Sequence, residues 1–239
     1  MQRSIPSWPW GPLCLALALG ACDESSNLVS GPIGPIPTTL AIVSGNHQDG
    51  MAHRWQSDPF VVRLSDAHGA PLPGGAVYWS VASGGGDLCD TMPVTCPGGP
   101  VQTITNADGE AKVWLAPVAL GAILVRAIAS GLEGSPVTFQ TNAVGLVVYA
   151  YPPSDCNNPM QFFGLEGTGP VTVPVGTIIE WEILACGGRI ASTTGPAGVM
   201  FDSGPLNPSE SFAFVPTVVG RWDYQDVYTG GTGTLIAIP

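Results

Sequence analysis

The density of glycine and proline is the feature that most limits what this chain can fold into. Thirty-two glycines and twenty-four prolines are spread among short apolar runs along 239 residues. Proline lacks an amide hydrogen and glycine loses much backbone entropy on ordering, so both are unfavourable inside helices. The pattern therefore disfavours long helices and favours many short strands joined by turns.

Residues 38–144 show the alternation of apolar and polar side chains that is typical of half-buried strands. The apolar sets expected to face a core are Phe60, Val62 and Leu64; Val77, Trp79 and Val81; Ala111, Val113 and Leu115; and Ile123, Val125 and Ala127. Residues 66–69 and 106–109 each end in glycine after turn-forming residues, and we predict both as hairpin connections.

Residues 145–239 have a similar strand spacing and form a second expected unit. Ile179, Trp181 and Ile183 share one face of a predicted strand, whose other face carries Glu180 and Glu182. Aromatic residues at a spacing of two are expected in its core, namely Phe212, Phe214, Trp222 and Tyr224. The chain is therefore predicted to be an all-β protein with two tandem β-sandwiches.

The first 21 residues have the pattern of an export signal. Arg3 supplies a positive charge, and an apolar run follows at residues 13–19. This run is too short to span a membrane, which takes about 20 apolar residues. Ordinary cleavage after Ala16-Leu17-Ala18 is one alternative. Leu19-Gly20-Ala21-Cys22 instead resembles the lipobox of bacterial lipoproteins, which implies a diacylglyceryl group on Cys22 and a new N-terminus there.

The number of cysteines agrees with this interpretation. Removal of residues 1–21 takes Cys14 away and leaves an odd set: Cys22, Cys89, Cys96, Cys156 and Cys186. A lipid on Cys22 leaves four, which suits two disulfides in an oxidising compartment. Four cysteines allow three connectivities, of which Cys89 with Cys96 and Cys156 with Cys186 keeps each bridge inside one domain.

Residues 22–37 are predicted to be a lipidated tether. They end in the glycine- and proline-rich sequence Gly-Pro-Ile-Gly-Pro-Ile-Pro, and such linkers favour an extended conformation of about 3.1 Å per residue. The tether could hold a folded domain up to about 45 Å from a bilayer. We expect the protein in the bacterial cell envelope, lipid-anchored on the periplasmic face or at the cell surface.

The charge of the chain excludes some classes of partner. Without Arg3, six basic residues face eighteen acidic ones, and Lys112 is the only lysine. Nucleic-acid binding needs clustered basic side chains, so no nucleic-acid partner is expected. Electrostatic attraction to an anionic membrane is disfavoured for the same reason.

Five motifs in residues 38–144 carry a family resemblance. They are Ile-Val-Ser-Gly-Asn at 42–46, Pro-Phe-Val-Val-Arg-Leu-Ser-Asp-Ala-His-Gly-Ala-Pro at 59–71, Val-Tyr-Trp-Ser-Val-Ala-Ser-Gly-Gly-Gly at 77–86, Thr-Asn-Ala-Asp-Gly-Glu-Ala at 105–111 and Gly-Leu-Glu-Gly-Ser-Pro-Val-Thr-Phe at 131–139. Their order resembles the bacterial immunoglobulin-like domains of invasin and intimin. The resemblance implies a β-sandwich that serves as a structural or adhesive module. The insert between Cys89 and Cys96 departs from the family pattern.

The second unit resembles a different family. Its segments 171–181, 201–212, 220–224 and 232–236 are similar to successive strands of a cupredoxin, the plastocyanin-like sandwich. By that resemblance Asp226 stands at the cysteine ligand, Gly231 at the methionine, and Gly188-Arg189 near a histidine. A blue-copper site needs two imidazoles and a thiolate, and residues 145–239 contain no histidine. We therefore expect a cupredoxin-like domain without copper ligands, metal or cofactor.

Two arrangements of side chains suggest hydrolytic chemistry. Glu180 and Glu182 lie about 6.8 Å apart on a strand, a spacing found in inverting glycosidases; the solvated face of an antiparallel sheet is the favoured interpretation. His53, Asp66 and Ser203 follow the chain order of one catalytic triad. They fall in different domains, however, and no Gly-x-Ser-x-Gly motif is present, so no enzyme is predicted.

Tyr78 and Trp114 are a candidate partner-binding surface, because the alternation of their strands turns them away from the predicted core. The insert or the second domain could cover them instead. The sequence thus predicts a non-enzymatic, membrane-anchored lipoprotein that presents β-sandwiches for adhesion, binding or spacing. Its expected partner is an unknown protein or glycan. The alternative is a cupredoxin-derived metal-binding or redox protein with an altered site.

Overall fold

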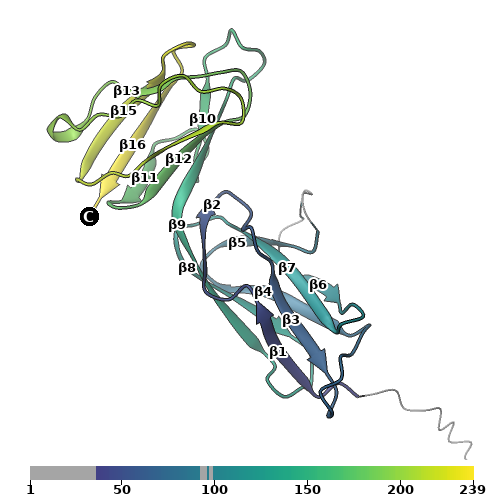
Figure 1. Cartoon of the computed structure of the whole chain (residues 1–239). Coiled ribbons are helices and arrows are strands. Elements are labelled where there is room, and N and C mark those ends of the chain that lie inside the picture. The colour runs from purple at the N-terminus through teal and green to yellow at the C-terminus, as the bar shows by residue number, and fades with distance from the viewer. Residues whose placement is uncertain (1–35, 92–95, 97–98) are drawn as a thin grey trace, which may run out of the picture. The chain divides into compact units, whose positions relative to one another are not determined.

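The structure is a computed structural model that describes residues 36–91, 96 and 99–239 (Figure 1). The predicted signal, the lipobox with Cys22 and residues 22–35 of the predicted tether lie outside the described residues. Within the described ranges, strands dominate, and a short 3-10 helix spans Pro196–Gly198. No helix in that part of the chain is long and apolar enough to cross a membrane. The expected all-β fold is confirmed.

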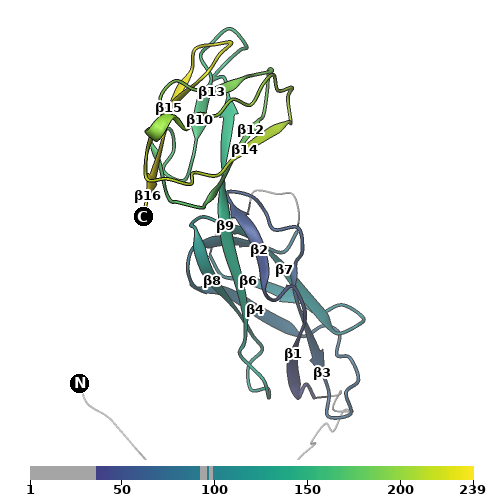
Figure 2. The same ribbon diagram turned by 60° about the vertical axis from the view of Figure 1, so that its left-hand side comes forward.

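The first sandwich is made of two sheets (Figure 1). One has the order β1-β3-β7-β5, and the other contains β9, β8, β4 and β6 as successive neighbours. The strands are β1 (Thr39–Ser44), β2 (Gln48–Ala52), β3 (Phe60–Ser65), β4 (Ala76–Ser83), β5 (Gly86–Cys89), β6 (Val101–Ile104), β7 (Glu110–Pro117), β8 (Gly121–Ile128) and β9 (Val137–Tyr151). Strand β2 pairs with β9 in parallel, and Figure 2 shows the two side by side.

The four predicted apolar sets do face the core of this sandwich. Phe60, Trp79 and Phe139 pack together there, with ring centroids 4.9 Å apart for the two phenylalanines and 5.9 Å apart for Trp79 and Phe139. Trp79 also donates a hydrogen bond from Nε1 to Thr103 Oγ1 at 2.8 Å. Its indole N–H is thereby satisfied in an otherwise apolar core.

The two predicted hairpins are wrong in one respect. Residues 66–69 and 106–109 do form tight turns, with positive φ at Gly69 and Gly109. The first turn does pair the end of β3 with the residues that follow it, through an antiparallel bridge between Ser65 and Pro71. Neither turn joins two consecutive strands of one sheet, however, because β3 pairs with β1 and β7 and not with β4, while β6 and β7 lie in different sheets. The turn sequence fixes a local reversal of the chain but not the sheet into which the next strand inserts.

The second sandwich has one layer with the order β14-β12-β9, in which β10 also pairs with β9, and another with the order β11-β16-β15-β13. The additional strands are β10 (Gln161–Phe163), β11 (Val171–Pro174), β12 (Ile178–Ile183), β13 (Ile190–Ser192), β14 (Ser211–Phe214), β15 (Gly220–Asp226) and β16 (Thr232–Ile238). The pairs β9 with β12 and β11 with β16 are parallel.

Aromatic side chains fill the second core, as predicted. Trp181 is fully buried, with its ring centroid 5.1 Å from that of Phe201 and 5.3 Å from that of Tyr224. Phe212 and Phe214 are partly buried and pack against this core. Burial raises the pKa of Tyr224 to about 12, so this phenol stays neutral over the whole physiological range.

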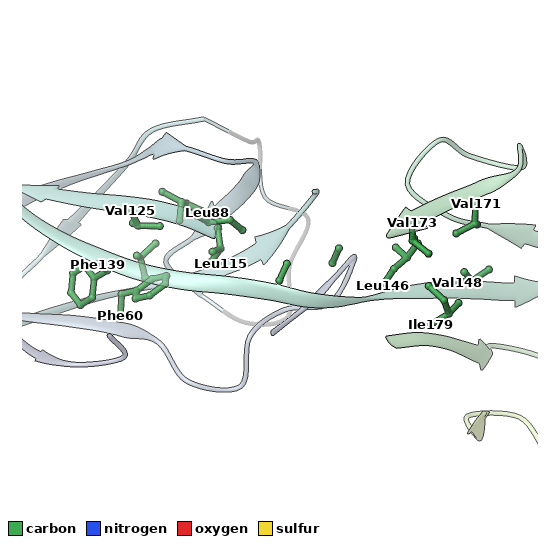
Figure 3. Close-up of a cluster of buried hydrophobic side chains, with 14 of the residues drawn as sticks. Phe60, Leu88, Leu115, Val125, Phe139, Leu146, Val148, Val171, Val173 and Ile179 are labelled. Carbon is green, nitrogen blue, oxygen red and sulfur yellow. The ribbon is translucent and has the colours of Figure 1, made fainter. Parts of the chain in front are cut away.

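Strand β9 belongs to both sandwiches. Odd-numbered residues such as Phe139 and Ala143 are buried in its first half, whereas Leu146, Val148 and Ala150 are buried in its second half. Figure 3 shows buried side chains of one continuous cluster along the strand, from Phe139 to Leu146. The predicted domain boundary between residues 144 and 145 lies inside this strand, where the register between β2 and β9 shifts.

Gly145 occupies the crossing point. A Cβ atom at this position would lie 2.6 Å from the carbonyl oxygen of Ile178 and 2.6 Å from Met51 Sδ. Any side chain would therefore push β2 or β12 away from β9. The close approach of these strands requires glycine here.

Both disulfides pair as expected. Cys89 is bonded to Cys96, and Cys156 to Cys186, with Cα atoms 5.6 Å apart in each bridge. The first bridge closes a seven-residue separation next to β5, and the second closes thirty residues of the second sandwich. These four thiols are therefore not available as metal ligands.

Candidate functional site

The position that matches the copper-binding cysteine holds Asp226, which is completely buried at the end of β15. Its Oδ1 accepts a hydrogen bond from the Arg189 backbone N–H at 2.8 Å. Its Oδ2 accepts bonds from the backbone N–H and the hydroxyl of Thr229, at 2.9 and 2.6 Å. A buried carboxylate needs such donors, since an unpaired charge in a protein interior is very unfavourable. Three internal donors thus satisfy this one.

The same network closes the loop that follows β15. The Asp226 N–H donates to the Gly231 carbonyl at 2.8 Å, and the Gly230 N–H donates to the Asp226 carbonyl at 2.9 Å. The Thr229 hydroxyl, which donates to the carboxylate, accepts a bond from the Met160 N–H at 2.9 Å. Asp226 therefore holds its own loop and fastens it to the segment that precedes β10.

Two glycines, Gly231 and Gly188, stand at positions that match copper ligands, and both are closely surrounded by protein atoms. A Cβ atom on Gly231 would lie 2.0 Å from the Met160 carbonyl oxygen. One on Gly188 would lie 3.2 Å from Met160 Cε and 3.3 Å from Asp226 Oδ1. A side chain at Gly231 would therefore require movement of the Met160 backbone, whereas one at Gly188 would have to displace the side chains of Met160 and Asp226.

Copper does not fit this donor set. The four aligned positions supply one carboxylate that already accepts three hydrogen bonds, two glycines and the side chain of Arg189. A blue-copper centre needs imidazole and thiolate ligands. In residues 36–91, 96 and 99–239, no group of three or more His, Cys, Asp or Glu side chains is placed to hold a metal ion.

Arg189 also carries an ion pair at this end of the molecule. Its Nε lies 3.0 Å from Asp202 Oδ1, and its Nη2 contacts Asp202 Oδ2. The guanidinium lowers the pKa of Asp202 to about 2. This two-point contact holds the residue whose backbone N–H serves Asp226.

The structure does not assemble the triad considered from sequence. The Ser203 hydroxyl donates to the Gly204 carbonyl at 2.6 Å and accepts from the Ile190 N–H at 2.9 Å. Asp66 Oδ1 accepts the N–H groups of His68 and Ala70, and so stabilises a turn. No hydrogen bond joins His53, Asp66 and Ser203 to one another among the described contacts, and each has a structural role.

Tyr78 and Trp114 do not share a surface. Tyr78 lies on β4 and is half exposed, whereas Trp114 lies on β7 with Lys112 Nζ 4.9 Å from its ring centroid. Strands β4 and β7 belong to opposite sheets of the first sandwich, and the buried residues beside them are Trp79 and Val113. The two aromatic side chains therefore point outward from opposite layers.

Glu180 and Glu182 do not form a solvated face, and this expectation is corrected. Arg54 Nη1 and Nη2 lie 2.9 and 3.0 Å from the two oxygens of Glu180, and Nη2 also lies 2.7 Å from Glu182 Oε2. The glutamate side chains are only 19% and 25% exposed. Strand alternation predicted the face correctly but could not reveal that a distant arginine covers it.

Tyr149 and His53 extend this cluster. The Tyr149 hydroxyl donates to the His53 carbonyl at 2.6 Å, and the His53 N–H donates to the Pro117 carbonyl at 2.8 Å. The Arg54 hydrogen bonds hold the pKa of Glu180 below its usual range, and burial lowers the pKa of His53. The cluster is thus charged at Arg54 and Glu180 and neutral at His53 near pH 7.

Sequence reasoning missed Arg54 entirely. It lies 126 residues before Glu180, so no local spacing connects the two. One available signal was Gly145 inside an apolar strand, because an interior glycine often marks a close approach of backbones. A second was the scarcity of basic residues, which makes each arginine a strong candidate partner for the many acids.

No protein-family profile matches the chain. No curated protein sequence matches it either.

Solved structures similar to the chain include members of both families that the motifs resemble. A purple cupredoxin from Nitrosopumilus maritimus is 20% identical, with a TM-score of 0.31, over 38% of this chain and 98% of its own. The D0-D1 domain of intimin is 12% identical, with a TM-score of 0.32, over 83% of this chain and 95% of its own. Invasin, described as a bacterial integrin-binding protein, is 16% identical, with a TM-score of 0.31, over 83% of this chain and 38% of its own.

Proposed function

We propose that this chain is a non-enzymatic lipoprotein of a bacterial envelope, anchored through lipid on Cys22, which presents its β-sandwiches for adhesion, binding or spacing. The hydrogen-bonded surroundings of Asp226 are the observation that supports a protein without enzymatic activity. The position where the cupredoxin resemblance would place reactive metal is filled by a carboxylate with three internal donors. The partner is a protein or glycan of unknown identity.

The cysteine pairing supports the anchor. Two disulfides use Cys89, Cys96, Cys156 and Cys186, so Cys22 alone remains after cleavage of the predicted signal. A single thiol outside the bridges suits the thioether of a lipoprotein. The disulfides also suit an oxidising, extracytoplasmic location.

Two experiments test the proposal. Expression in a bacterial host with a labelled fatty acid should label the full chain and place it in the membrane fraction, whereas Cys22→Ser should be unlabelled. Titration of the purified protein with Cu(II) should give no visible thiolate-to-copper band. Absence of label on the wild type would overturn the proposed lipid anchor. A strong visible band would favour the alternative of a redox protein with an altered copper site.

A further inference from the structure

We propose that the contact of Arg54 with Glu180 and Glu182, which we call the latch, couples the two sandwiches so that they tumble in solution as one rigid body. It acts through the segment Gln48–Gln56, which we call the junction segment. This inference goes beyond the proposed function, because it requires neither the lipid nor any partner. It concerns how movement in one sandwich is passed to the other.

The two sandwiches share a strand and a core, and this is the first requirement for coupling. Buried apolar side chains from both form one cluster, and Figure 3 shows it along β9. The partners of β9 overlap: β8 pairs with residues 137–143, β2 with residues 141–146 and β12 with residues 145–150. Strand β2 therefore pairs with β9 across the point where the pairing of β9 with β8 stops and its pairing with β12 starts.

The junction segment is fixed to both sheets of the first sandwich. Gln56 donates from Nε2 to Thr141 Oγ1 at 2.6 Å, and Thr141 donates to the Gln48 carbonyl at 2.6 Å. The Gln56 N–H donates to the Leu115 carbonyl at 2.8 Å. Because Thr141 lies on β9 and Leu115 on β7, the segment moves with the first sandwich.

Arg54 then carries the connection into the second sandwich. Its guanidinium makes a two-point contact with Glu180 and a third contact with Glu182, both on β12. A planar guanidinium bonded at three points resists rotation as well as separation. Tyr149 adds a neutral bond from β9 to the His53 carbonyl beside it.

Removal of the cation should be more disruptive than removal of the acids. Without Arg54, two partly buried carboxylates would remain two residues apart on one face of β12 and would repel one another. With both acids neutralised, no such repulsion arises. A latch therefore predicts an order of effects, in which Arg54→Gln loosens the junction more than Glu180→Gln with Glu182→Gln.

The test is nitrogen-15 relaxation on the mature chain with Cys22→Ser, which reports the rotational correlation time of each sandwich. We expect one common correlation time for the wild type, and two values in Arg54→Gln that differ by more than their uncertainties. The matched control is Arg63→Gln, which removes an ion pair to Glu110 within the first sandwich and should leave one common value.

Common tumbling that persists in Arg54→Gln would overturn the latch, and separate tumbling in the wild type would overturn the coupling itself. If Arg54→Gln fails to fold, Glu180→Gln with Glu182→Gln provides the same test without two facing carboxylates, because the one charge that it leaves unpaired is on the Arg54 side chain, which is 37% exposed. Unchanged common tumbling in that variant would then reject the proposal. None of these outcomes depends on lipidation or on copper, so failure here leaves the proposed function intact.

Discussion

Two carboxylate sites of the second sandwich are stabilised in different ways. Asp226 is completely buried and is bonded by N–H and O–H groups of Arg189 and Thr229, without a cation. Glu180 and Glu182 remain partly exposed and are bonded by a guanidinium from 126 and 128 residues away. The comparison teaches that fixed dipoles from nearby segments organise a loop, whereas a long-range ion pair joins two domains.

The largest expected effect comes from opening the bridge at the Asp226 end. The Cys156–Cys186 disulfide spans thirty residues, so its replacement by two serines should lower the free energy of unfolding by about 3.5 kcal/mol in the chain-entropy description. Urea unfolding followed by tryptophan fluorescence measures the change. The Cys89–Cys96 bridge spans only seven residues and serves as control, with about 2.5 kcal/mol expected. A larger loss from the shorter loop would contradict this.

Asp226→Asn should cost about 2 to 3 kcal/mol of unfolding free energy, because an amide N–H₂ would face a donor in place of an acceptor. The same urea experiment applies, and the loss should not change when salt is added, since buried groups are poorly screened. Asp87→Asn is the control, because that side chain is exposed on β5 of the other sandwich and should matter little. A loss at Asp226 no greater than at Asp87 would show that its three bonds do not stabilise the loop.

The stabilisation at the Arg54 site, unlike that at Asp226, should depend on salt. A double-mutant cycle with Arg54→Gln and Glu180→Gln should give a coupling of about 1 kcal/mol at low ionic strength. Since Arg54 is 37% exposed, that coupling should decrease at about 1 M salt. A coupling energy that stays constant with salt would show that this ion pair is as poorly screened as Asp226. The two sites would then not differ in how they are stabilised.

Acidification should have the smallest and most selective effect. The pKa of Glu180 is lowered below 4.5 by Arg54, and the pKa of His53 is lowered below 6.5 by burial. A group whose pKa is lowered in the folded state binds its proton more readily in the unfolded state. Stability therefore decreases as the pH is lowered, below 6.5 for His53 and below 4.5 for Glu180. The stability difference between wild type and Arg54→Gln should therefore be complete at neutral pH and decrease as the pH is lowered below 4.5. A difference that stays constant on acidification below 4.5 would exclude the carboxylate of Glu180 as the acceptor.

Much of the fold could be predicted, because alternation along a strand reports which face is buried. Trp79 and Trp181 were both expected in the cores and are there. The shared strand was not expected, because the burial phase of β9 changes near Gly145, and a change of phase looks like a boundary between domains. The positions around Asp226 were anticipated from the cupredoxin resemblance. Its donors were not, since a backbone N–H such as that of Arg189 leaves no signal in a sequence.

The double membership of β9 limits how the chain can be divided. A fragment that ends at residue 144 would lose Gly145 and Leu146, which pair with Met51 and Ala52 of β2. A fragment that begins at residue 145 would start directly with a core strand and would lack Arg54. The two sandwiches are therefore less independent than the two family resemblances suggest. Replacing either one by another domain would also require replacing its part of β9 and the residues that pair with it.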